Sequence, residues 1–233
     1  MTFAKLILTY VAIAAMFHCS HLKAATVQVI AGVESSELLE GVNLSDDSPT
    51  VFISVDWNFD QGEFAGANCY ASTADASRAV GRGCDVYAGY FRSFKQNNAV
   101  AVQLTRHVYS RAFNRSWDFT ELSTSWHVSK KSSFTASYSA NWLGLPYDAY
   151  SLRADTQIPV SESLALNLSA NVHALESGAP VDELLSAKIS LTYLYERWTT
   201  ELGLVVSDND QARVLALDID EPEALLSVSY RLF

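Results

Sequence analysis

Residues 132–143, "SSFTASYSANWL", alternate between apolar and small polar side chains. The apolar positions of this stretch are Phe134, Ala136, Tyr138, Ala140 and Trp142. Alternation with a period of two is typical of a β-strand whose two faces meet different surroundings. The stretch therefore predicts a two-faced strand, and its neighbours decide what kind of sheet contains it.

The same alternation recurs along the chain, for example in "TVFISVDWNF" (50–59), "SLALNLSANVHAL" (163–175) and "LLSVSYRLF" (225–233). We predict twelve strands in total, each about ten residues long, which is the length that a tilted strand needs to cross a bilayer. Their predicted starts lie near residues 27, 50, 63, 83, 98, 117, 132, 148, 163, 185, 198 and 224.

The connections between these strands alternate between short and long. Short ones include "DQG" (60–62) and "SKKS" (129–132), and long ones include "STADASRAVGRG" (72–83) and the segment 207–223. This order is typical of an up-and-down antiparallel barrel with its N-terminus in the periplasm, and twelve is an even number, as expected for single-chain outer-membrane barrels.

The composition of the polar faces favours a transmembrane β-barrel over a soluble, lipocalin-like barrel. A sheet surface that faces water is usually rich in Lys and Glu, whereas the polar faces here are mainly Ser, Thr, Asn and Ala. Aromatic residues near strand ends fit the girdles of a membrane barrel. These residues are Trp57, Phe59, Trp126, Phe134, Trp142, Tyr195 and Trp198.

The N-terminus predicts export. Lys5 precedes an apolar run that is too short for a transmembrane helix, and small residues follow at Ala24 and Ala25. We interpret residues 1–25 as a signal peptide and residues 26–233 as the barrel domain, with an uncleaved anchor helix as the alternative. The formal charge of −10 becomes about −12 without Lys5 and Lys23, which argues against nucleic acid as a partner.

Two cysteines remain after the predicted cleavage, Cys69 and Cys84. Export places them where disulfides form, and they flank a loop that contains Gly and Ser. We predict a disulfide between them, with two free thiols as the alternative.

The stretch "GVNLSDDSPTVFISVDWNFDQGEFAGANCYAS" (41–72) resembles an uncharacterised family of proteobacterial outer-membrane β-barrel proteins. The matching positions are Gly41, Val42, Ser45, Asp46, Asp47, Pro49, Asp56, Gly62 and Phe64–Gly66. Glu40 stands where the family tends to have Arg, and Cys69 is a second departure. The resemblance implies an exported barrel and supplies no activity.

The C-terminal "LLSVSYRLF" resembles the strand by which outer-membrane proteins are recognised for assembly, which implies the barrel-assembly machinery as a partner. Leu226, Val228, Tyr230 and Leu232 form its apolar face, and Phe233 is out of phase with them. Either the strand bulges at Arg231, or Phe233 lies at the periplasmic interface.

No candidate chemistry outweighs a structural role. His127 and Ser129 are spaced as a strand-borne His-x-Ser pair, but they adjoin a short turn and lack a supporting surround. His107 and His173 lie on separate strands without the converging ligands of a metal site. The acidic segment 207–223 lacks calcium-loop spacing. We therefore expect no catalytic residue, metal or cofactor.

Charged residues on the polar faces are expected to point into the lumen. They can bias ion passage, or they can pair and plug the barrel. These lumen candidates are Asp56, Arg153, Asp155, Lys188, Glu201 and Arg231.

These observations predict a monomeric protein of the bacterial outer membrane, in contact with its lipid and acting as a small porin-like channel or a passive envelope protein. A membrane-embedded enzyme that hydrolyses lipid or peptide is one alternative. A surface protein that binds or adheres through its loops is another.

Overall fold

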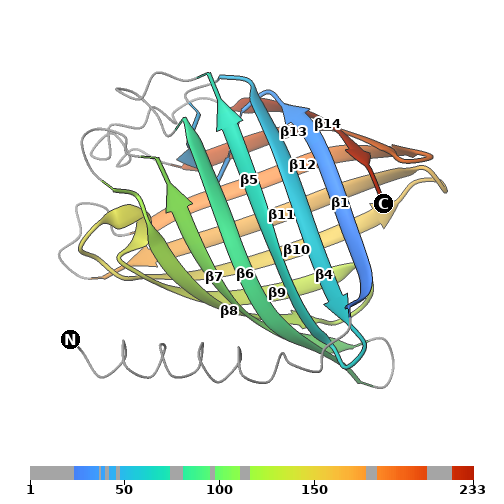
Figure 1. Ribbon diagram of the computed structural model, residues 1–233. Coiled ribbons are helices and arrows are strands. Elements are labelled where there is room, and N and C mark those ends of the chain that lie inside the picture. Colours follow the sequence, from blue (N-terminus) through green and yellow to red (C-terminus); the bar gives the residue numbers. More distant parts are fainter. Residues whose placement is uncertain are drawn as a thin grey trace.

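The computed structural model describes residues 24–36, 38–39, 42–45, 48–73, 81–94, 98–110, 116–176, 183–208 and 222–233. Twelve antiparallel strands form a closed barrel in which each strand pairs with its neighbours along the chain and β14 pairs with β1 (Figure 1). The strands are β1 (Ala24–Glu34), β4 (Thr50–Phe59), β5 (Glu63–Ser72), β6 (Arg82–Ser93), β7 (Ala99–Tyr109), β8 (Phe119–His127), β9 (Ser132–Ala140), β10 (Ala149–Pro159), β11 (Leu164–Leu175), β12 (Glu183–Tyr195), β13 (Trp198–Asp208) and β14 (Glu223–Arg231).

The predicted architecture is therefore confirmed, and each predicted strand start lies within three residues of the observed one. Two short strands, β2 (Leu38–Leu39) and β3 (Val42–Asn43), form a small separate hairpin, and a 3₁₀ turn, η3, covers Trp142–Gly144. No helix within the described residues is long and apolar enough to cross a membrane. We call the barrel end with the long connections the loop end, and the other the turn end.

The outer face of the barrel is apolar. Large exposed side chains on it include Leu152 (63% exposed), Leu202 (59%) and Trp126 (54%). Directly opposite residues in an antiparallel pair share one face, so the register places the alternate, mostly polar residues of each strand inside. An apolar exterior around a polar interior is the arrangement of a barrel that spans a bilayer, as the sequence predicted.

On the inner face of the barrel, glycines of β1, β5 and β6 are each covered by an aromatic ring from the adjacent strand. A Cβ atom built on Gly66 would lie 2.4 Å from the Tyr87 ring, so the ring occupies the space that a side chain would fill. The same relation holds for three other pairs, which are Gly32 with Phe52, Gly83 with Tyr109 and Gly89 with Phe64. These pairs let bulky rings lie flat against the wall inside a narrow barrel.

The closing seam pairs Ile30–Glu34 of β1 with Ser227–Arg231 of β14 in unbroken register. The chain therefore has no bulge at Arg231. Beyond the strand, the Leu232 amide donates a hydrogen bond to the Val29 carbonyl at 2.8 Å. Phe233 is 73% exposed at the turn end, in keeping with the interfacial alternative.

The predicted signal peptide lies mostly outside the described residues. Strand β1 begins at Ala24, two residues before the predicted cleavage point, and its pairing with β4 is irregular between Ala24 and Thr26. Cleavage after residue 25 would leave the regular part of β1 intact, and the signal peptide stays a prediction.

Candidate functional site

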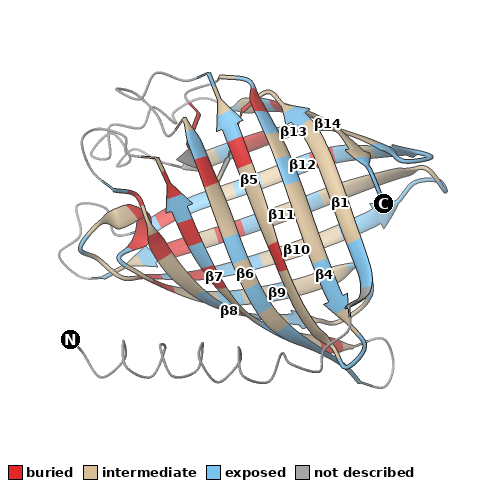
Figure 2. Cartoon of the chain, in the orientation of Figure 1, coloured by how far each residue is buried: buried red, intermediate tan, exposed pale blue. Residues whose placement is uncertain are grey.

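The lumen is filled at its loop end by one apolar cluster, which we call the plug. Inward-facing strand residues form its rim, and side chains from the connections fill its centre. Figure 2 shows many of the buried strand segments toward this end of the barrel. The central side chains are almost fully buried, with exposures of 1% for Leu44 and 0% for Trp117, Trp142 and Leu143. The rim consists of Tyr70, Tyr109, Phe119, Ala149 and Leu184, with Phe52 and Leu175 packed against it.

Trp142 reaches the plug because β9 ends at Ala140. Asn141 and Leu143 adopt left-handed backbone conformations, with φ of 54° and 51°, and turn the chain inward. Gly144 also has positive φ, and a Cβ atom there would lie 2.0 Å from the carbonyl oxygen of Ser116. The expectation that Trp142 belongs to the outer aromatic girdle was therefore wrong, since the strand pattern does not continue through the turn.

A small polar cluster lies against the plug. His107 Nδ1 lies 2.8 Å from Asp85 Oδ1 and 3.1 Å from the Tyr109 hydroxyl. The His107 ring stacks on Phe119 with centroids 4.1 Å apart. His107 is only 6% exposed, so it acts as a buried link between the plug and the β6–β7 wall.

Below the plug, β10–β13 line an open polar cavity of about 390 Å³. We call it the charged cavity. Four of the six lumen candidates line it, together with Lys131 from the neighbouring turn and several small polar side chains. The inward-facing residues of the charged cavity are Ser133, Arg153, Asp155, Gln157, Asn167, Ser169, Lys188, Ser190 and Glu201.

The charges in this cavity form two ion pairs. Arg153 Nη2 lies 2.8 Å from Asp155 Oδ1, and both side chains belong to β10. Lys188 Nζ lies 2.6 Å from Glu201 Oε1 on the next strand. The Lys188 stem passes Gly203, where a Cβ atom would lie 3.6 Å from Lys188 Cε. The Lys188 stem therefore lies against the wall at Gly203 on its way to Glu201.

Amides and hydroxyls fill the floor between the two pairs. Asn167 Nδ2 donates to Thr192 Oγ1 at 2.8 Å, and Gln157 Nε2 donates to Asn167 Oδ1 at 3.1 Å. Asn171, above Asn167 on β11, is 8% exposed, and neither polar atom of its side chain has a hydrogen-bond partner among the described residues.

The other two lumen candidates lie elsewhere on the inner face. Asp56 accepts a hydrogen bond from the Tyr87 hydroxyl across the β4–β6 wall. Arg231, opposite Ile30, lies at the turn end of β14. Pairing is thus the observed arrangement for Arg153, Asp155, Lys188 and Glu201.

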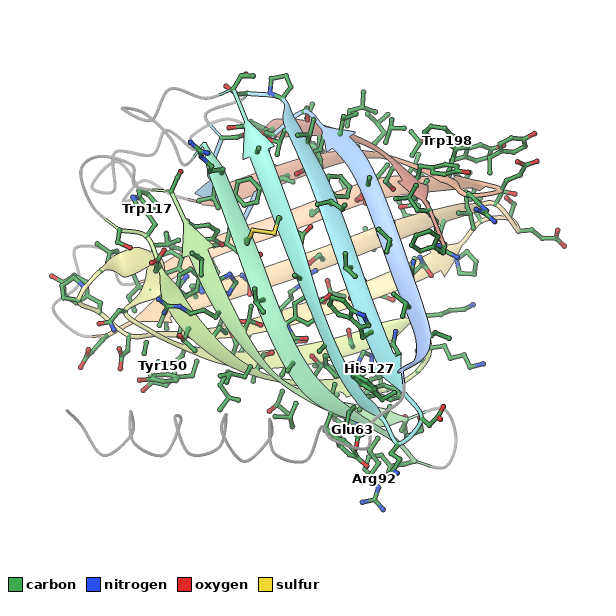
Figure 3. All side chains as sticks on the ribbon, in the orientation of Figure 1. Glu63, Arg92, Trp117, His127, Tyr150 and Trp198 are labelled. Atoms are coloured by element: carbon green, nitrogen blue, oxygen red, sulfur yellow. A yellow bond between two sulfur atoms is a disulfide. The ribbon has the colours of Figure 1, made fainter. Side chains whose placement is uncertain are left out.

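The structure contains the predicted disulfide between Cys69 and Cys84, with a Cα–Cα distance of 4.0 Å. The two residues are directly opposite each other on β5 and β6. Cys69 also faces Ile53, and Cys84 faces Val108, and both of these neighbours are exposed on the apolar exterior. The disulfide therefore lies on the outer face near the loop end (Figure 3).

The weak catalytic candidate does not assemble. Ser129 Oγ accepts hydrogen bonds from the Lys131 and Ser132 amides, each at 3.1 Å, and so stabilises the turn. The His127 ring instead meets Phe91 edge-on, with centroids 5.8 Å apart, at the opposite end of the barrel from Trp117 (Figure 3). Within the described residues, no three His, Cys, Asp or Glu side chains are grouped for a metal ion. The acidic segment is mostly outside that part, at residues 209–221.

No known protein-family model matches this chain, and no curated protein matches it in sequence. Solved structures do match its fold. The NanC porin superposes with a TM-score of 0.58 at 12% identity, over 88% of this chain and 100% of that one. The KdgM porin superposes with a TM-score of 0.56 at 10% identity, over 88% and 98%. The chain thus shares the barrel fold of these porins.

Proposed function

We propose that this protein is a narrow outer-membrane channel for small polar solutes, with the plug as a hydrophobic constriction at its loop end. The observation that carries this proposal is that one barrel contains both a polar, charged cavity and, nearer its loop end, a buried apolar cluster. Hydrophobic constrictions close channels by excluding water. The porin fold of the structural neighbours supports the same function.

The charge of the lumen favours cations over anions. On the described strands, seven inward-facing carboxylates outnumber three inward-facing Arg and Lys side chains. The carboxylates are Glu34, Asp56, Asp85, Glu121, Asp155, Glu201 and Glu223, and the bases are Arg153, Lys188 and Arg231. A solved KdgM porin complex contains oligogalacturonate, an acidic sugar, and this lumen does not favour such a polyanion.

Single-channel recording in planar bilayers tests the proposal. We expect a small current that reverses at a potential favouring K⁺ over Cl⁻ in a salt gradient, and a several-fold larger current for the Trp117→Ala/Trp142→Ala variant. Trp126→Ala, which removes an exposed Trp from the outer face, is the matched control and should leave the current unchanged. If neither folded wild type nor the double variant conducts, the protein is not a channel.

We further propose that the chain belongs to the uncharacterised outer-membrane barrel family that residues 41–72 resemble, that it is exported through residues 1–25, and that it acts as a monomer. Its folding would involve the barrel-assembly machinery and outer-membrane lipid. Support comes from the barrel architecture and from the continuous pairing of β14 with β1.

A further inference from the structure

The two ion pairs of the charged cavity point in the same direction along the barrel. Strand β10 runs from the loop end to the turn end, so Arg153 lies nearer the loop end than Asp155. Strand β12 runs the same way, and Glu201 is opposite Thr192, four residues below Lys188. On both sides of the cavity the base is therefore nearer the plug and the acid nearer the turn end.

The floor between the pairs leaves room for a small molecule. Asp155 is opposite Ser169, and Ser169 is opposite Lys188, so the Cα atoms of the two charged residues lie about 10 Å apart at the usual strand spacing. The side chains on this floor are short or amide-bearing. The cavity of about 390 Å³ falls within the range of about 300–1,000 Å³ that is typical of small-molecule sites.

We propose that the charged cavity binds small zwitterions, of the size of an amino acid or a dipeptide. The carboxylate would lie toward Arg153 and Lys188, and the ammonium toward Asp155 and Glu201.

Other ligand classes fit this lining less well. An anion would meet Asp155 and Glu201, and a simple cation would meet Arg153, Lys188 and Lys131. Among the described side chains that face inward and line the cavity, none is large and apolar, so an apolar ligand has little surface to contact. Only a molecule with both charges is complementary to two parallel dipoles. This inference deepens the proposed channel function, since the zwitterion would be a solute in passage.

Calorimetric titration of the folded full chain in detergent tests the inference with three matched probes. These are L-alanyl-L-alanine, its N-acetyl derivative and its C-terminal amide. We expect the zwitterionic dipeptide to bind at least about tenfold more tightly than either derivative, because each derivative loses one charge-assisted set of hydrogen bonds. Equal binding of the three probes would overturn the inference, as would equal binding of the dipeptide and the acetylated anion.

Two variants locate the site. Lys188→Met/Glu201→Gln and Arg153→Gln/Asp155→Asn each remove one dipole and conserve side-chain size, and each should weaken dipeptide binding about tenfold. Heat-modifiable migration in gels checks that each variant is folded. If one variant does not fold, the other still tests the site. Arg106→Gln/Asp118→Asn is the matched control, because it removes an ion pair of 3.8 Å outside the cavity. Dipeptide binding that survives both cavity variants would place the ligand elsewhere.

Binding and conduction separate the two proposals. Zwitterion binding without single-channel current would retain the site and reject the channel. Current without selective zwitterion binding would retain the channel and reject the site.

Discussion

The two ends of the lumen rest on the same alternating strands and are filled in opposite ways. At the loop end, Trp117, Trp142 and Phe119 are at most 1% exposed and form a dry core. In the charged cavity, Arg153 and Lys188 contact their acidic partners directly and still keep 49% and 34% of their side chains exposed. The alternation therefore determines which residues face the lumen. The chemical type of those residues then determines whether that part of the lumen is packed or open to water.

This contrast implies that stability and solute contact are separated along the barrel axis. Close-packed apolar side chains stabilise a fold by several kilocalories per mole each, whereas ion pairs that remain in contact with water contribute little. Substitutions in the plug should therefore change the free energy of unfolding most. Substitutions in the charged cavity should change it little.

Truncation of Trp142 is expected to have the largest effect. Trp142→Ala should lower the free energy of unfolding by about 3–5 kcal/mol, because it leaves a cavity in a fully buried site. Urea unfolding in lipid vesicles measures the loss. Trp126→Ala on the outer face is the control, and a comparable loss there would mean that the plug is no better packed than the lipid-facing surface.

Loss of the disulfide should have an intermediate effect. It joins residues 15 apart in sequence, and closing a loop of that size contributes about 3 kcal/mol in the chain-entropy treatment. Cys69→Ser/Cys84→Ser should therefore lower the free energy of unfolding by about 2–3 kcal/mol. A reductant should lower wild type to the same value and leave the variant unchanged. If the serine variant were as stable as wild type, the disulfide would contribute nothing to the stability of the barrel.

The Lys188–Glu201 pair should have the smallest effect. A double-mutant cycle with Lys188→Met and Glu201→Gln should give a coupling of about 0.5–1 kcal/mol in urea unfolding, because both side chains keep contact with water. Coupling should also fall at high salt. A coupling as large as the Trp142→Ala loss would contradict the separation of the two ends.

The strands of the barrel wall could be predicted from the sequence. The contacts between side chains inside the lumen could not. Period-two alternation located the twelve strands and placed Arg153 and Asp155 on one inner face, because strand geometry depends on local order alone. Lys188 and Glu201 were both placed inside, but their pairing depends on the β12–β13 register, which the strand pattern does not give. Trp142 was misplaced because its direction depends on a left-handed turn at Asn141.

The position of the disulfide illustrates the same limit. Its cysteines were paired from export and spacing, yet nothing in the spacing indicated that the bond would lie against lipid. That follows only from the register, which aligns Cys69 with Ile53 and Cys84 with Val108.

The seam between β1 and β14 has a kinetic consequence. Its register contains five residue pairs, extended by three backbone hydrogen bonds at Val29 and Ser35, whereas β11 and β12 share eleven pairs. A closed ring of strands opens first where the fewest backbone bonds must break, so amide hydrogen exchange should begin along Ile30–Glu34 before it reaches the β10–β13 wall. The barrel would then open from one line of contact. The charged cavity begins one strand away, because β13 pairs with β14, so its β13 side, which carries Glu201, should lose its shape before its β10 side.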